Sequence, residues 1–129
     1  MELTIIIIVV ALLQYSFFIF KVGFSREKYG VSAPKTVGNE QWERLFRVQQ
    51  NTMEQLVIFI PAIVIFSHIV SMQWALLPGV LFIVGRQAYY HLYTKNPASR
   101  APGMVLGFLS NMGMLLAIIV TLLLNYFTL

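Results

Sequence analysis

Long apolar runs separated by short polar connections dominate the pattern of this chain. Each run is about 20 residues or longer, which corresponds to about 30 Å of helix and matches the hydrocarbon core of a bilayer. The second run starts with a polar stripe at Gln41 and becomes apolar from Leu56 to Val70, interrupted by Pro61, Ser67 and His68. Runs of this length predict membrane-spanning helices. The expected helices are residues 2–22, 41–70, 74–94 and 101–128.

Two polar connections and one very short turn join these helices. Residues 23–40 are rich in glycine, proline and charged side chains, which favour a loop, and residues 95–100 form a second polar connection. Only Ser71–Gln73 separate the second and third helices, so these two are expected to form an antiparallel hairpin. The pattern predicts an all-α fold, an integral membrane four-helix bundle of up-down topology, with residues 1–129 forming a single four-span domain.

The composition supports a membrane location. Hydrophobic residues make up 58% and charged residues 11% of the 129 residues, whereas soluble domains are about half apolar and a quarter charged. A domain this small cannot bury so many large side chains, so the surplus must face lipid or partner subunits. A cleaved signal peptide is a competing interpretation of the first run, but Glu2 stands where such a peptide carries basic residues.

Cysteine is absent, and histidine occurs twice. These counts exclude disulfides, thiolate metal sites and a cysteine nucleophile of the chain's own, and two histidines are too few for a histidine-built zinc site. We therefore expect no metal, and any thiol chemistry must use a thiol supplied from outside.

The basic residues lie at one end of the expected bundle. Both termini and the short turn carry none of them. Because cytoplasmic connections of membrane proteins are enriched in lysine and arginine, we expect both polar loops in the cytoplasm and both termini on the other side. The nine basic residues are Lys21, Arg26, Lys28, Lys35, Arg44, Arg47, Arg86, Lys95 and Arg100.

Polar residues recur at helical spacing where the second helix enters the membrane. Arg44, Arg47, Asn51 and Glu54 are three or four residues apart and share one face. Exposing ionisable groups to lipid costs about 2.5–3.5 kcal/mol each, so this face must line the bundle interior or a wet cavity. The alternative is a structural ion pair, or snorkelling of the charges to the interface.

The third helix presents a similar face. Arg86, Tyr89 and Tyr93 follow at positions i, i+3 and i+7, which places two phenols and a guanidinium together. An aromatic belt at the membrane interface is the alternative. Several arginines around the single carboxylate of Glu54 suit an anionic ligand that also carries a cation. Nucleic acid is disfavoured because the arginines lie at membrane depth and not along an exposed surface.

Small residues recur at the start of the fourth helix. Gly103 and Gly107 are four residues apart, with Ser110 and Asn111 one turn further on. Such a stripe favours close helix packing in membranes, although lipid-facing glycine is the alternative.

Two blocks of sequence resemble a known family. The stretch from Glu43 to Glu54, ERLFRVQQNTME, and the spacing of Arg86, Tyr89, Tyr93 and Arg100 are similar to the signatures of the MAPEG family, the membrane-associated proteins in eicosanoid and glutathione metabolism. The resemblance covers the whole chain at the level of helices and loop lengths. It implies a homotrimer that holds glutathione between neighbouring subunits near the cytoplasmic face.

The resemblance also implies roles for individual residues. Arg100 would be catalytic, because its positive charge beside the sulfur favours the thiolate. Glu54 would meet the ammonium of glutathione, and arginines would meet its carboxylates. Arg26, Gln49 and Arg100 would come from the neighbouring subunit. The implied glutathione-binding residues are Arg26, Arg47, Gln49, Asn51, Glu54, Arg86, Tyr89 and Tyr93.

The implied activity is a glutathione S-transferase, with possible peroxidase activity, that attacks hydrophobic electrophiles or lipid hydroperoxides delivered from membrane lipid. Gln55 stands where many mammalian members carry an aromatic residue, and Glu27 stands where the leukotriene-forming members have a second arginine next to the Arg26 position. A detoxifying enzyme of the kind found in bacterial inner membranes is therefore the better match. One alternative is a non-catalytic lipid-binding protein resembling the family's lipoxygenase-activating member. Another is a small transporter or structural membrane subunit.

Overall fold

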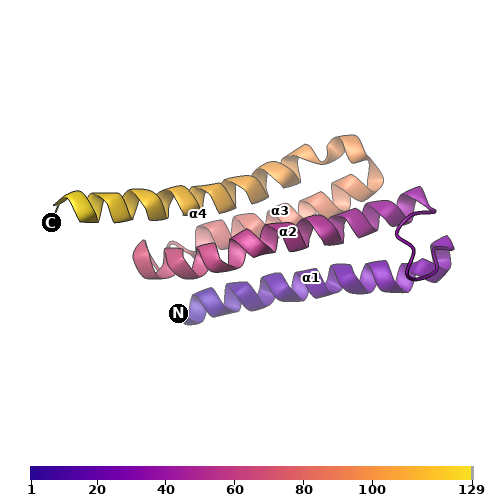
Figure 1. Cartoon of the computed structure of the whole chain (residues 1–129), viewed down its shortest axis with the longest axis horizontal. Helices are drawn as coiled ribbons and strands as arrows, with labels where there is room; N and C mark the ends of the chain where they lie inside the picture. Colours follow the sequence, from indigo (N-terminus) through magenta and orange to yellow (C-terminus); the bar gives the residue numbers. More distant parts are fainter. Residues whose placement is uncertain (129) are drawn as a thin grey trace.

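The computed structural model describes residues 1–128 and contains four long helices that lie side by side (Figure 1). No strand occurs in this part of the chain. The two chain ends lie at one end of the bundle, and the α1–α2 and α3–α4 connections lie at the other (Figure 1). This arrangement confirms the all-α, up-down four-helix bundle. The elements are α1 (Glu2–Tyr29), α2 (Glu40–Ile69), α3 (Leu76–Lys95), η1 (Pro97–Ser99) and α4 (Ala101–Thr128).

Helix α1 is longer than the sequence pattern predicts. It continues through Gly23 and ends at Tyr29, so the connection begins seven residues later than expected. Gly30 terminates the helix in the left-handed conformation, with φ of 71°, and its N–H bonds to the last-turn carbonyls. This is a frequent role of glycine after a helix, whereas Gly23 lies within the turns that precede it. Basic side chains in the last turn also favour the longer helix, because they complement its dipole.

Helix α2 begins where its capping residues place it. The side chain of Asn39 accepts a hydrogen bond of 2.9 Å from the backbone N–H of Trp42, and Glu40 and Glu43 lie in the first turn. Asparagine at this position and acidic residues after it both stabilise a helix start. The helix continues through Pro61 to Ile69, so a single element carries the polar stripe from the loop end into the apolar part of the bundle.

Helices α3 and α4 are in backbone contact. A Cβ atom added to Gly103 would lie 2.5 Å from the backbone nitrogen of Tyr89 and 2.8 Å from the carbonyl oxygen of Gly85. Further along, the Ser110 hydroxyl donates to the carbonyl of Pro78 at 2.6 Å. This confirms that the small-residue stripe is a packing surface rather than a lipid-facing one. The contact fixes the end of α3, and therefore Tyr89, against the start of α4.

Gly103→Ala is expected to lower the stability of the bundle by about 1–3 kcal/mol, because the added methyl group would collide with backbone that cannot move independently. Gly113→Ala is the matched control, since nothing lies within 4 Å of its added Cβ. Thermal unfolding of both variants in the same detergent measures the difference. Equal unfolding temperatures would contradict the packing role of Gly103.

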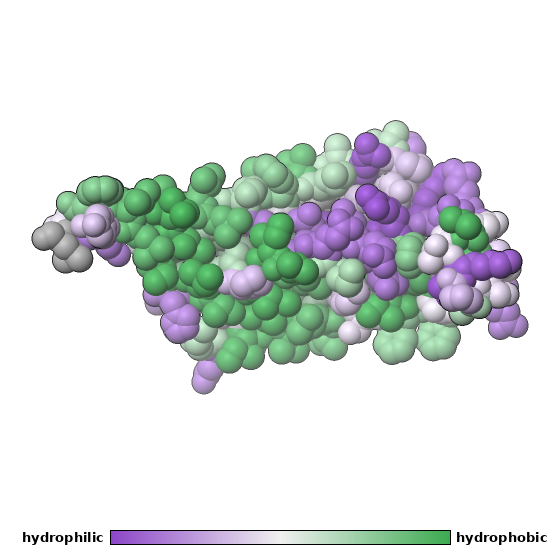
Figure 2. Space-filling view, viewed as in Figure 1, coloured by the Kyte–Doolittle hydropathy of each residue, from purple (hydrophilic) through white to green (hydrophobic). Residues whose placement is uncertain are grey.

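The outer surface is suited to lipid. Figure 2 shows a mostly hydrophobic face, and large apolar side chains such as Leu13 and Leu116 are about two-thirds exposed. Three segments are long and apolar enough to cross a membrane: Glu2–Tyr29, Glu40–Ile69 and Pro97–Thr128. Helix α3 is not among them, because Arg86 and its tyrosines lower its hydropathy. That α3 crosses the membrane stays a prediction. The side of the membrane on which the loops and the termini lie is also a prediction.

Candidate functional site

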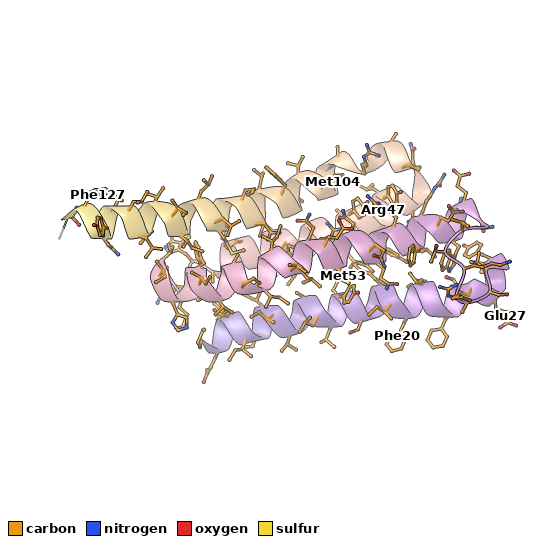
Figure 3. The ribbon with its side chains drawn as sticks, in the orientation of Figure 1. Phe20, Glu27, Arg47, Met53, Met104 and Phe127 are labelled. Carbon is orange, nitrogen blue, oxygen red and sulfur yellow. The ribbon has the colours of Figure 1, made fainter. Side chains whose placement is uncertain are left out.

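The polar stripe of α2 forms a band on the surface of the bundle. Figure 2 shows hydrophilic residues over α2 toward the end that carries the α1–α2 connection, next to an otherwise hydrophobic surface. Arg47 lies on the side of α2 that faces α4 in this view (Figure 3). Arg47 and Glu54 are exposed, and Gln49 and Asn51 are half-buried. These side chains are therefore available to a ligand or to another subunit.

Glu54 has no cationic partner within residues 1–128. The only ion pair in this part of the chain joins Arg44 to Glu40, with 2.6 Å between Nη2 and Oε1. The alternative that Glu54 belongs to a structural ion pair therefore has no support from the geometry of one chain. The carboxylate remains free to meet a cation from outside.

Tyr89 and Tyr93 form the α3 part of the site. Their rings stack with 5.1 Å between centroids and 6° between planes. Tyr89 is 3% exposed and packs with Val48 of α2 and Phe18 of α1. Three helices therefore hold this phenol in place, and Tyr93 continues the stack toward the end of α3.

Three arginines lie within electrostatic range of the Tyr89 hydroxyl. Arg47 from α2, Arg86 from α3 and Arg100 from the start of α4 all lie close enough to interact electrostatically with it. The short η1 turn makes this possible, since Asn96 accepts a hydrogen bond of 3.1 Å from Ala98 N–H and folds the chain back. Within one chain, Arg100 comes within electrostatic range of Tyr89, and the assignment of Arg100 to the site of a neighbouring subunit stays a prediction.

Arg86 differs from the other arginines because it lies inside the bundle. It is 1% exposed, and its guanidinium carbon lies 4.6 Å from the centre of the Tyr89 ring. Its Nε and Nη2 atoms have no hydrogen-bond partner among the described residues. In one chain, the Arg86 guanidinium therefore packs against the Tyr89 ring inside the bundle and is not accessible from the surface.

Arg26 is held by the α1–α2 connection. Its Nη1 donates to the carbonyl of Lys35 at 2.7 Å, and its guanidinium lies over the Trp42 ring at 4.5 Å. The indole N–H in turn donates to the Val22 carbonyl at 3.0 Å. Within residues 1–128, no hydrogen bond or ion pair joins Arg26 to Tyr89 or Tyr93.

One buried polar contact was not predicted. The side-chain amide of Asn111 donates to the Gln55 side chain at 3.0 Å and links α4 to α2. Its carbonyl oxygen and the Thr52 hydroxyl are buried without partners in the described residues. The sequence signal was the position of Asn111 on the buried glycine stripe, which forces its amide to find a partner inside the bundle.

Five of the candidate residues lie in one region of the bundle, and Arg26 lies apart from them. Within residues 1–128, no group of three or more histidine, aspartate or glutamate side chains could hold a metal ion. The residues brought together at the loop end of α2, α3 and α4 are Arg47, Arg86, Tyr89, Tyr93 and Arg100. Asn51 and Glu54 continue the Arg47 face one and two turns along α2, and Arg26 is held separately by its loop.

Comparison with known proteins places this geometry in context. The model of the MAPEG family matches residues 4–120. A Synechocystis protein described as uncharacterized is 38% identical over 107 residues, covering 83% of this chain and 78% of that protein. Human microsomal glutathione S-transferase 2 is 34% identical over 90 residues, covering 70% of this chain and 61% of that protein. Mouse leukotriene C4 synthase is 28% identical over 91 residues, with coverages of 70% and 61%.

Proposed function

Since the chain belongs to the MAPEG family, we propose that it is a membrane glutathione S-transferase that activates glutathione as a thiolate. The observation that carries this proposal is that Arg47, Arg86 and Arg100 all act electrostatically on Tyr89, while the exposed Glu54 of α2 has no ion-pair partner within residues 1–128. The transferase and leukotriene synthase named above are similar to this chain over less than two thirds of their own length, so they support the chemistry and not a particular electrophile.

The charges of the site match those of glutathione. This tripeptide carries two carboxylates, one ammonium and one thiol. Exposed guanidinium groups such as that of Arg47 bind carboxylates through paired, charge-assisted hydrogen bonds. Glu54 provides the complementary partner for the ammonium, and Gln49 and Asn51 supply neutral donors and acceptors. A purely lipid-binding protein has no use for this set.

Arg100 activates the sulfur of glutathione by favouring its thiolate form. A free thiol has a pKa of about 8.5, so only a few per cent of it is thiolate at pH 7. A guanidinium beside the sulfur favours the anion, and the Tyr89 hydroxyl can donate a hydrogen bond to it. The sulfur then forms a bond to an electrophilic carbon as the leaving group departs. With a lipid hydroperoxide, it attacks oxygen, the O–O bond breaks to give an alcohol, and a second glutathione reduces the sulfenic acid formed.

We propose that the working assembly is a homotrimer. Asn51 and Glu54 lie on the exposed side of α2, about 20 Å along the helix from its first turn, a depth at which charges must not face lipid. A neighbouring copy would cover this face and would bring its own Arg26 and Gln49 toward the bound glutathione. The site would open toward the cytoplasm, and hydrophobic substrates would arrive laterally from the bilayer.

Rapid mixing of the full, detergent-purified chain with glutathione at pH 7 tests the proposal. The ultraviolet absorbance of the thiolate is expected to rise and to saturate with glutathione concentration. S-Methylglutathione, which has the same charges but no ionisable sulfur, is expected to bind without this signal. If calorimetry detects no glutathione binding and no absorbance rise occurs, the chain does not activate glutathione.

A further inference from the structure

A cavity lies at the end of the bundle that carries the α1–α2 connection, and Tyr90 forms part of its wall. It has a volume of about 490 Å³ and lies between the last third of α1, the start of α2 and the end of α3. Arg47, Tyr89 and Arg100 do not line it. Its volume is in the range of cavities that hold small ligands or lipid headgroups. Nothing in the proposed transferase chemistry uses this space.

The charge of the cavity wall is positive and unbalanced. Lys21 and Lys28 are two helical turns apart on α1 and both line the cavity. Their ammonium groups lie over aromatic rings of the wall, 6.0 Å from the centre of Phe17 and 5.2 Å from the centre of Tyr29. No acidic residue lines this cavity, and the carboxylate of Glu40 is already paired with Arg44. The cavity therefore favours an anion.

The cavity wall also combines aromatic and polar side chains. On the side of the bundle centre it is aromatic, with Phe17 and Phe20 from α1 and Tyr90 from α3. The Tyr90 ring stacks on Phe18 at 5.3 Å and meets the edge of Phe17 at 5.7 Å, so this part is packed. On the loop side, Lys28 and Gln41 line the wall together with the apolar side chains of Phe24 and Leu45. Aromatic and basic side chains next to one another are typical of the interface between hydrocarbon and headgroups.

An exposed apolar stripe leads away from the aromatic side of the cavity. Val10, Leu13, Phe17 and Phe20 recur at helical spacing on α1 and are 41–65% exposed. Phe20 projects away from the bundle (Figure 3). From Val10 to Phe20 the stripe is about 15 Å long, enough to lie along much of an acyl chain.

We propose that this cavity binds the headgroup of an anionic phospholipid, with the phosphate held by Lys21 and Lys28 and an acyl chain lying along the apolar stripe. Basic residues at the cytoplasmic surface attract anionic lipids, and here they are set into a cavity of defined shape. A zwitterionic lipid would bring its own ammonium toward the two lysines and bind more weakly. The site is independent of glutathione, so its failure and the failure of the proposed transferase activity are separate outcomes.

Thermal unfolding of the full chain in detergent, titrated with dioleoyl phosphatidylglycerol or dioleoyl phosphatidylcholine, tests the site. Phosphatidylglycerol is expected to raise the unfolding temperature saturably, and phosphatidylcholine to do so much less. In the Lys21→Gln, Lys28→Gln double variant the apparent affinity for phosphatidylglycerol is expected to fall on the order of 30-fold. The matched control is Lys35→Gln, Lys95→Gln, which removes the same charge at the same end of the bundle but outside the cavity. This control is expected to bind like the unchanged protein.

Three results would overturn the proposal. Equal losses in the two double variants would mean that general surface charge attracts the lipid. If phosphatidylcholine stabilises the protein as much as phosphatidylglycerol does, or if neither lipid stabilises it, the cavity does not select an anionic lipid. Stabilisation by glycerol 3-phosphate at the same concentration would mean a site for a soluble phosphate ester. Native mass spectrometry of the unchanged protein, with retained phosphatidylglycerol expected, provides a second readout if a double variant fails to fold.

Discussion

Arg100→Ala is expected to abolish the saturable thiolate signal and to lower the transferase rate by about 100- to 1000-fold, the usual effect of removing one preorganised charge from a reacting centre. Arg100 lies between η1 and α4, is exposed, and acts electrostatically on Tyr89. Its removal should therefore leave the fold intact. Glutathione affinity is expected to change only a few-fold, because Arg47 and Glu54 remain.

The pH dependence gives the sign of the effect. A positive charge beside the sulfur lowers the thiol pKa, so the unchanged protein should reach its full rate at a lower pH than the Arg100→Ala variant, whose rate should still be rising near pH 8.5. Arg100→Lys, which keeps the charge but not the fork of donors, should retain part of the signal. Lys95→Ala is the control for loss of a nearby cation. Equal thiolate formation in the Arg100→Ala variant and the unchanged protein would remove Arg100 from the mechanism.

Glu54→Gln is expected to weaken glutathione binding about 10- to 100-fold, because the ligand ammonium would lose its charged partner in a site shielded from water. Stability should change little, since Glu54 has no ion-pair partner in the described residues. Calorimetric titration and thermal unfolding of the same preparations measure the two quantities. Glu40→Gln, which breaks the ion pair with Arg44, is the control expected to leave the affinity unchanged.

A glutathione analogue that lacks the α-amino group separates binding from structure. The unchanged protein and the Glu54→Gln variant should bind this analogue with similar affinity, because neither can form the ammonium contact with it. If the variant binds the analogue as poorly as it binds glutathione, Glu54 acts through the shape of the site and not through its charge.

Helical periodicity was sufficient to predict most of the fold. The predicted range of α4 coincides with the observed one, and that of α2 is displaced by one residue. The predicted end of α1 was wrong because either of two glycines, Gly23 and Gly30, could terminate the helix, and only Gly30 takes the left-handed conformation. A residue's tolerance of that conformation can be predicted from sequence, but which of two glycines adopts it depends on the packing of the following loop.

The site shows a similar division. Spacing alone predicted that Arg47, Asn51 and Glu54 share a face, since the helical period fixes angular position. It could not predict that Arg86 lies inside the bundle while Arg47 lies outside. That distinction depends on which face of α3 packs against α4. The approach of Arg100 to within electrostatic range of Tyr89 was also beyond sequence reasoning, because it depends on the path of the η1 turn.

The backbone contact between α3 and α4 also has a consequence for the order of assembly. In a bilayer, helices gain little from excluding water from one another, so a pair that touches backbone to backbone through glycine has an advantage over pairs that meet through long side chains. Residues 96–100 are a short connection, so closing this hairpin costs little chain entropy. The α3–α4 hairpin is therefore expected to form soon after insertion, with Arg86, Tyr89 and Arg100 already in place. Arg47 joins the site only when α2 packs against this hairpin. The affinity for the ligand therefore measures whether folding is complete.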